Sequence, residues 1–116
     1  MAIYSRVVLS GAADGKGVVV AATAAGGTTI HTAHATAKDE VYLWVINTHT
    51  VAVDLTIEWG GTASPDNLFC VALPIPIKSA LQCVVPGLTL TNSLVVKAYA
   101  SVASKLVLGG HVNRIT

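Results

Sequence analysis

The chain has 116 residues, of which 53% are hydrophobic and 11% charged, and its formal net charge at pH 7 is +1. This length corresponds to one domain, residues 1–116, large enough for one hydrophobic core. A typical soluble domain carries about 25% charged residues, so the low charged fraction argues against a monomer whose whole surface is exposed to water. The sequence also has no basic cluster, which argues against a nucleic-acid partner.

The first third of the chain predicts three short strands separated by turns. The segment Ile3–Leu9 is rich in β-branched residues and is expected to form the first strand. A turn follows and ends at Asp14-Gly15, a strong turn signal. The apolar segment 17–22 predicts a second strand. Residues 28–35 alternate Thr and His with Ile and Ala, which indicates a third, exposed strand.

The central stretch Val41–Gly61 predicts two strands joined by a hairpin turn at Asn47–Thr50. In residues 51–59, Val, Leu, Ile and Trp alternate with Ala, Asp, Thr and Glu, so one face should be buried and the other mostly polar. In residues 41–46 both faces are apolar, so we expect this strand to be covered on both sides.

The last half of the chain predicts further strands between loops. Residues 60–67 form a polar loop. The segment Pro74-Ile75-Pro76 predicts an edge or a crossing, because proline lacks the N–H that a central strand needs. Gly109-Gly110 predicts a bulge or bend within the last strand. The expected strands are 68–73, 79–85 (ended by Pro86-Gly87), 88–90, 94–100 and 105–115.

Strands of five to nine residues with turns between them, and no capped helical period, predict an all-β domain of eight or nine strands. The expected architecture is an antiparallel β-sandwich of the jelly-roll type. An immunoglobulin-like sandwich of seven strands is the alternative, although its Cys–Trp–Cys spacing is missing.

Neither of the longest uncharged runs predicts a transmembrane helix, which needs about 20 consecutive apolar residues. Residues 17–37 contain five Thr, two His and three Gly, and residues 79–96 contain Pro86 and Asn92. The N-terminal residues 1–17 have no compact apolar segment behind a basic start, so no signal peptide is expected. These runs indicate no membrane partner.

The residues with reactive side chains do not converge in any known catalytic or cofactor pattern. His31 and His34 would point to opposite faces of a strand, so no metal site is expected. Asp54 and Glu58 share a strand face but lie roughly 13 Å apart, too far for a glycosidase pair and typical of a solvated face. No nucleophile elbow, phosphate loop or dinucleotide motif is present. We therefore expect no enzyme, no catalytic residues and no cofactor.

Two further pairs favour packing over chemistry. Cys70 and Cys83 form no zinc pattern, and we expect two buried free thiols, with a disulfide as the alternative. Trp44 and Trp59 could form a sugar-binding platform, but such large aromatic side chains more often belong to the core.

Three segments resemble small β-rich structural proteins of tailed-bacteriophage particles: LTIEWGGTASPDNLF (55–69), LQCVVPGLTLTNSLVVKAYAS (81–101) and GGHVNRIT (109–116). The resemblance implies a virion protein made in the host cytoplasm. Within that group it implies a capsid decoration (cement) protein on the capsid surface, commonly a homotrimer, with the major capsid protein as its partner. A head–tail connector or tail component is the related alternative, and a carbohydrate- or receptor-binding sandwich is the competing class.

For such a protein we expect the partner contacts to come from the N-terminal arm and from the polar loop. The arm, residues 1–6, has few packing anchors and is expected to become ordered only on a neighbour, with Arg6 pairing to an acidic partner residue. The loop 60–67 contributes no core residues, which suits a surface contact. The candidate contact residues are Ile3, Tyr4, Arg6, Pro65, Asp66 and Asn67.

Overall fold

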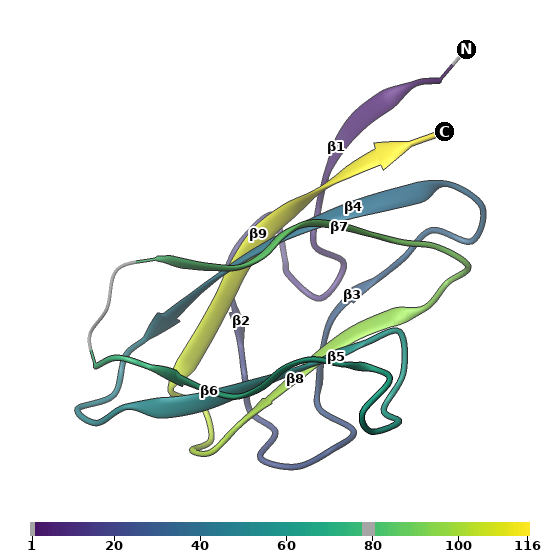
Figure 1. Cartoon of the computed structure of the whole chain (residues 1–116). Coiled ribbons are helices and arrows are strands. Elements are labelled where there is room, and N and C mark those ends of the chain that lie inside the picture. Colours follow the sequence, from purple (N-terminus) through teal and green to yellow (C-terminus); the bar gives the residue numbers. More distant parts are fainter. Residues whose placement is uncertain (1, 78–80) are drawn as a thin grey trace.

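The computed structural model describes residues 2–77 and 81–116, and in these residues the chain forms nine strands in two antiparallel sheets. Figure 1 shows the two sheets as stacked layers. Along the chain, the strands are β1 (Tyr4–Val8), β2 (Val18–Val19), β3 (Thr28–Thr32), β4 (Lys38–Asn47), β5 (Val53–Trp59), β6 (Leu68–Ile75), β7 (Gln82–Leu90), β8 (Val95–Ala100) and β9 (Leu106–Ile115).

The strand order confirms the predicted sandwich and its jelly-roll type. Sheet A has the order β1-β9-β4-β7, with the short strand β2 also paired to β9, and sheet B has the order β3-β8-β5-β6. Strands β1 and β2 therefore act as one interrupted edge strand, which gives two four-stranded layers connected in jelly-roll order. The immunoglobulin-like alternative has seven strands in a different order.

The core lies between the sheets and is built from the alternating apolar positions that the sequence pattern indicated. In β4, Val41, Leu43 and Val45 are fully buried, and they face Leu55 and Ile57 of β5 in the same core. Strand β9 contributes Leu106, Leu108 and Val112. A period of two in each strand thus places one set of side chains inside and leaves the other set on an outer face.

The predicted hairpin between residues 41 and 61 is wrong. Strand β4 pairs with β7 and β9 in sheet A, whereas β5 pairs with β6 and β8 in sheet B. The connection 48–52 therefore crosses from one sheet to the other, and Val51 is exposed rather than part of the strand. The Asn47 side chain supports this crossing, because its amide donates to the carbonyls of Val51 and Ile75.

Several strand boundaries differ from the prediction for reasons of edge geometry. Pro86 does not end its strand, because β7 lies at the edge of sheet A and pairs only with β4. Likewise Pro74 lies within β6, an edge strand of sheet B, as its missing N–H predicts. Gly109-Gly110 form no bulge, since β9 pairs with β4 in unbroken register through both residues. Residues 79 and 80 of the predicted strand 79–85 lie outside the described part of the chain.

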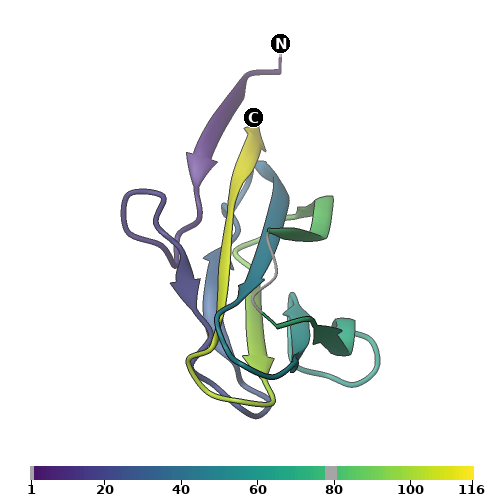
Figure 2. The same ribbon diagram turned by 90° about the vertical axis from the view of Figure 1, so that its left-hand side faces the viewer.

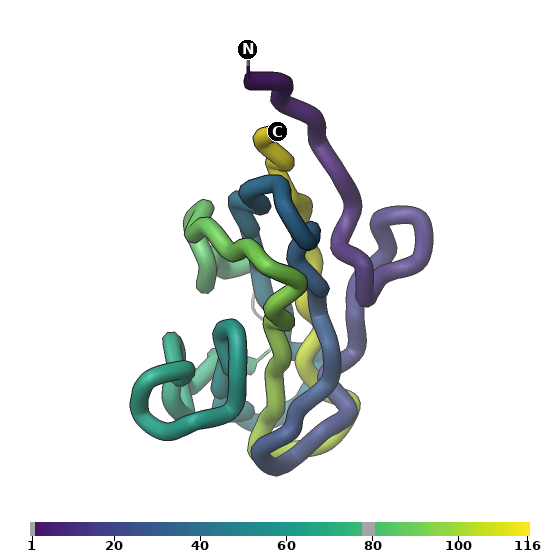
Figure 3. Tube along the Cα trace, turned by 90° about the vertical axis from the view of Figure 1, so that its right-hand side faces the viewer, coloured from purple at the N-terminus to yellow at the C-terminus, as the bar shows by residue number. Residues whose placement is uncertain are grey.

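The two ends of the described chain lie side by side at one end of sheet A (Figures 1 and 3). The backbone N–H of Ile3 donates to the carbonyl of Thr116, and the N–H of Thr116 donates to the carbonyl of Ile3. The loop between β1 and β2 and the loop between β5 and β6 both project from the body of the molecule (Figures 2 and 3). None of the described segments is a helix of the length and apolarity that crossing a membrane requires.

Candidate interaction face

The side of sheet A that points away from the core is mostly uncharged, and none of its side chains is fully buried. Five strands contribute to this side, each through the alternate residues whose side chains do not point into the core. We call these residues the outer face of sheet A: Tyr4, Arg6 and Val8 of β1; Val19 of β2; Lys38, Glu40, Tyr42, Trp44 and Ile46 of β4; Cys83, Pro86 and Thr89 of β7; and Val107, Gly109, His111, Asn113 and Ile115 of β9.

Three aromatic rings form the centre of this face. Tyr42 and His111 are directly opposite each other on β4 and β9, with ring centroids 4.8 Å apart and planes inclined by 16°. The Trp44 ring lies 5.9 Å from His111 and 6.4 Å from Tyr42, again nearly parallel. On the β7 side, a Cβ atom added to Gly87 would lie 2.8 Å from the Tyr42 ring, so Tyr42 is held between Gly87 and His111.

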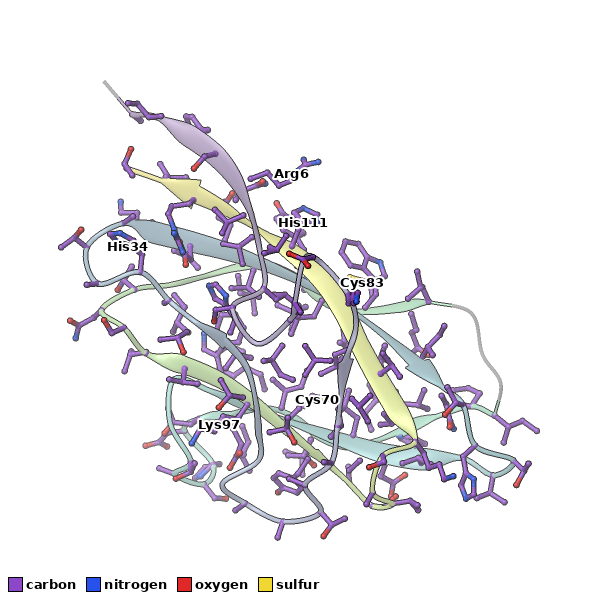
Figure 4. The ribbon with its side chains drawn as sticks, turned by 180° about the vertical axis from the view of Figure 1, so that it is seen from behind. Arg6, His34, Cys70, Cys83, Lys97 and His111 are labelled. Atoms are coloured by element: carbon purple, nitrogen blue, oxygen red, sulfur yellow. The ribbon has the colours of Figure 1, made fainter. Side chains whose placement is uncertain are left out.

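Charged side chains on the outer face lie only toward the end where the chain termini meet. Arg6 and Glu40 flank Asn113 in one row across the strands, and Lys38 lies in the next row. Figure 4 shows Arg6, His111 and Cys83 following one another along sheet A. Burial lowers the pKa of His111 from its ordinary value of 6.5, and the positive charge of Arg6 lowers it further, so the ring is neutral at pH 7. The centre of the face therefore carries no charge.

The position of Trp44 corrects two expectations. Strand β4 is not covered on both sides, because Tyr42, Trp44 and Ile46 remain partly exposed on the outer face. Trp44 is thus not a core residue, whereas Trp59 is only 6% exposed and its ring stacks on Phe69 at a centroid distance of 5.2 Å. The two tryptophans belong to different sheets, so they form no common sugar platform.

The outer face of sheet B differs because the chain itself covers part of it. Glu58, which we expected on a solvated face, is fully buried. Its carboxylate accepts hydrogen bonds from the backbone N–H groups of Gly26 (3.2 Å) and Gly27 (2.8 Å). The carbonyl of Ala22 accepts the N–H of Ala100 in the same region. The connection between β2 and β3 is therefore tied down over sheet B, and no equivalent segment is tied over the outer face of sheet A in the described chain.

A buried ionic cluster joins the two sheets beneath the end of the outer face. The Asp39 carboxylate accepts hydrogen bonds from Nε and Nη2 of Arg114, at 2.8 and 2.9 Å, and from the backbone N–H of His34 at 3.1 Å. Nε2 of His31, on strand β3 of sheet B, lies 2.8 Å from the same carboxylate. Burial alone would raise the pKa of Asp39, but the hydrogen bonds from Arg114, His31 and His34 outweigh it and lower the pKa to about 2.

This cluster has the geometry of a structural clamp. Nδ1 of His31 accepts the backbone N–H of Ser10, so Nε2 carries the proton and donates it to Asp39. Both ring nitrogens are used inside the protein, and the Ser10 hydroxyl accepts the N–H of Thr32 rather than contacting the ring. Across residues 2–77 and 81–116, no three His, Cys, Asp or Glu side chains converge as a metal site requires.

The three candidate contact residues of the N-terminal arm lie in or next to a strand. Met1 lies outside the described residues. Tyr4–Val8 pair with β9 as strand β1, so the arm is ordered within the chain itself and does not need a neighbour. Ile3 is exposed and hydrogen bonded to Thr116. Tyr4 and Arg6 are exposed on the outer face, and Tyr4 is its most exposed large apolar side chain at 71%.

The other three candidates lie on the loop between β5 and β6, at the edge of sheet B. Pro65 and Asp66 are exposed at the loop tip. Asn67 instead stabilises the loop, because its amide donates to the carbonyl of Trp59 and its side-chain oxygen accepts the N–H of Ala63. The structure therefore separates the predicted contacts into two groups on different sheets.

Both cysteines are free thiols, as the sequence favoured, but only Cys70 is shielded. Cys70 packs against the core from β6, while Cys83 is exposed beside Trp44 on the outer face of sheet A (Figure 4). The expectation that both are buried is therefore wrong for Cys83, and Cys70 is only partly buried. The strands β6 and β7 belong to different sheets, so the two residues are not cross-strand neighbours.

The sequence did not identify the outer face as a unit. The alternation of Val107, His111, Asn113 and Ile115 in the last strand, together with Tyr42 and Trp44, was a signal for it. What was missing was the pairing of β9 with β4, which brings these residues together. No family model matches the chain, and comparison with curated proteins and with solved structures gives no match either.

Proposed function

We propose that this chain is a non-catalytic structural protein that works through protein–protein contacts made by the outer face of sheet A. The observation that carries this proposal is the partly exposed, uncharged centre of that face around Tyr42, Trp44 and His111. Exposed apolar side chains on β1 and β2 border it: Tyr4, Val8 and Val19. Large exposed apolar patches with a polar rim are typical of protein interaction sites. The low charged fraction of 11% agrees with a surface that other subunits partly cover.

Within this class, we propose a decoration protein that binds and stabilises the capsid of a tailed bacteriophage. The support is the resemblance of residues 55–69, 81–101 and 109–116 to small β-rich virion proteins, and a compact sandwich without a converging set of reactive groups in its described part. A head–tail connector or tail component would also act through protein–protein contacts and is the related alternative. The exposed loop tip at Pro65 and Asp66 supplies a second contact region on the other sheet.

The test is to mix the purified protein with shells assembled from the coat protein of the same genome. Cosedimentation measures binding, and heating followed by light scattering measures the temperature at which the shells break. We expect the wild-type protein to bind and to raise this temperature, and Trp44→Ser to bind more weakly because it removes the largest ring from the face.

Deleting residues 1–6 is a poor test, because it removes part of strand β1 from sheet A. Arg6→Glu is the cleaner change, since Arg6 is exposed. Val71→Glu, at an exposed position on β6 of sheet B, is the matched control for introducing a carboxylate. If the wild-type protein neither binds the shells nor raises their disruption temperature, the decoration role is wrong.

A carbohydrate-binding module is the second candidate, because three rings lie within 6.4 Å of one another on an exposed face. Sugar rings stack on open aromatic faces, whereas the Tyr42 ring is held between His111 and Gly87. This arrangement favours a protein partner. Binding to a glycan array that is lost in Trp44→Ser, with no binding to shells, would replace the decoration role by this candidate.

A further inference from the structure

Strand β9 runs along the middle of the outer face, with β4 on one side and β1 or β2 on the other. Each outer-face residue of β9 therefore has one neighbour from each side in the same row. Asn113 lies between Arg6 and Glu40, His111 between Val8 and Tyr42, and Val107 between Val19 and Ile46. In each of these rows the two residues that flank β9 are thus either oppositely charged or both uncharged.

The charged row is complementary to itself. Arg6 and Glu40 lie on opposite sides of β9, two strand spacings apart, or about 10 Å. A second copy turned by 180° about an axis along β9 places its Glu40 opposite Arg6 and its Arg6 opposite Glu40. A twofold interface uses the same patch on both copies in this way.

The apolar rows follow the same symmetry. The turn about β9 places Val8 opposite the second copy's Tyr42, and Val19 opposite its Ile46. His111 and Val107 lie on the axis and meet themselves. Because these side chains are uncharged at pH 7, no like charges are brought together in the centre of the interface.

The row of Gly109 contains the Trp44 ring on one side and no strand residue on the other. Trp44 is the neighbour of Gly109 on β4, but β1 ends at Val8 opposite His111 and β2 begins at Val18 opposite Leu108. No strand residue therefore lies beside Gly109 on that side, and a Cβ atom added to Gly109 would meet no atom within 4 Å. The same twofold turn places the second copy's Trp44 over this break between β1 and β2, next to Gly17, which has no side chain and lies against Val107.

We propose that the outer face of sheet A docks a second copy of this chain, with a twofold axis along β9. The inference rests on the proposed function only in that the face binds protein. It leaves the loop tip at Pro65 and Asp66 free for a different partner. It differs from the trimer expected from the resemblance, since the pairing of rows requires two copies.

The overlap in such a dimer covers three strands, β4, β9 and the edge formed by β1 and β2, because β7 lies beyond β4 and has no strand opposite it. Three strands about 4.8 Å apart and a ten-residue strand rising about 3.3 Å per residue give a face of roughly 480 Å² per copy. Two such faces bury about 950 Å², less than the roughly 1,200–2,000 Å² of stable interfaces, so the dimer is expected to be weak. Aligned sheets pack about 10 Å apart and cross at about 30°, so the rows near the middle of β9 make the closest contacts.

The first test uses the row of Gly109. Gly109→Leu adds a side chain where the isolated chain has room, so the fold and its thermal unfolding should be unchanged. In the dimer the added side chain would lie on the axis, where it meets its own counterpart in the second copy and crowds that copy's Trp44. Light scattering coupled to size exclusion should give a dimer for the wild type at about 100 μM and a monomer for Gly109→Leu, with a dissociation constant at least tenfold higher.

The second test uses the charged row. Arg6→Glu alone and Glu40→Arg alone each bring like charges together across the axis, so each should raise the dissociation constant about tenfold or more. The double variant Arg6→Glu/Glu40→Arg restores opposite charges and should restore the dimer. Val71→Glu, on β6, controls for an added carboxylate away from the face and should leave the dimer intact.

The outcomes separate this inference from the proposed function. Three results would overturn the twofold dimer. These are a wild-type monomer up to about 100 μM, a trimer, and a dimer that Gly109→Leu and the charge changes leave intact. A wild-type monomer that still binds shells, with binding lost in Gly109→Leu, would retain the face as a protein site and assign it to the shell. A dimer that does not bind shells would retain the twofold and remove the decoration role.

Discussion

Asp39 and Arg114 lie directly opposite each other on β4 and β9 and share two hydrogen bonds, of 2.8 and 2.9 Å. The Asp39 side chain is fully buried, and His31 from the other sheet contacts the same carboxylate. One carboxylate on β4 thus binds both β9 in the same sheet and β3 in the other sheet, next to the outer face that is proposed to bind protein.

Replacing Asp39 by Asn should destabilise the fold by about 2–4 kcal/mol. The change removes the charge that pairs with Arg114 and leaves that guanidinium, which is mostly buried, without its carboxylate. Urea unfolding followed by circular dichroism measures the loss. Asp54→Asn, at a half-buried carboxylate on sheet B, is the control and should cost less than about 1 kcal/mol. Equal losses in the two variants would contradict the role of the cluster.

The same carboxylate predicts a specific loss of stability in acid. Its pKa is lowered from 3.8 to about 2 on folding, so the unfolded chain binds the proton more tightly. The stabilisation is therefore fully present above about pH 4 and is lost as the pH falls from about 4 to about 2, by on the order of 2 kcal/mol. The difference in unfolding free energy between wild type and Asp39→Asn should shrink across this range. A difference that stays constant down to pH 2 would contradict this assignment.

His111 predicts a separate effect on association at milder pH. Burial and Arg6 hold its pKa below 6.5, so the ring gains its charge only as the pH falls below that value. At the proposed axis two such rings meet, and the groups that face each ring are Arg6 of β1, Tyr42 and Glu40 of β4. Of these, Arg6 adds further positive charge, so protonation should weaken the dimer between pH 7 and pH 5.

Sedimentation equilibrium at pH 7, 6 and 5 measures this effect. The wild-type dissociation constant should rise as the pH falls, whereas that of His111→Gln should change little over the same range. Since Asp39 titrates only below about pH 4, its cluster does not contribute here. A pH dependence that survives in His111→Gln would show that another group is responsible.

The two thiols should differ in reactivity. Burial raises the pKa of Cys70, and its sulfur lies 3.4 Å from the carbonyl oxygen of Leu55, so it stays protonated and shielded. Cys83 is exposed on the edge strand β7. Ellman's reagent should label one thiol per chain rapidly, and Cys83→Ser should remove this fast phase while costing less than about 0.5 kcal/mol of stability. Equal rates for both thiols would contradict the placement.

The architecture was predictable because most strands show a clear period of two and are separated by Gly, Pro or Asn. The alternation of Val53 to Trp59 correctly placed Leu55 and Ile57 in the core. The pairing of strands was not predictable in the same way. A short connection after Asn47 fits a hairpin and a crossing equally well, and the side-chain amide of Asn47, bonded to Val51 and Ile75, selects the crossing.

The candidate site was predicted only in part, for the same reason. Tyr4 and Arg6 were identified as contacts, but their relation to Tyr42 and His111 depends on pairings between residues more than thirty positions apart in the chain. Glu58 was assigned to a solvated face because its alternation is polar. The backbone of Gly26 and Gly27, which covers it, cannot be inferred from the period of β5.

The accessibility of Trp44 tests most directly the claim that the outer face of sheet A binds protein. In Trp59→Phe, Trp44 is the only tryptophan, so acrylamide quenching of fluorescence reports on that face alone. We predict that quenching decreases several-fold as the protein concentration rises or as shells are added, and that Gly109→Leu shows no decrease with concentration. Quenching of Trp44 that stays the same from nanomolar to high micromolar protein, with and without shells, would contradict the claim.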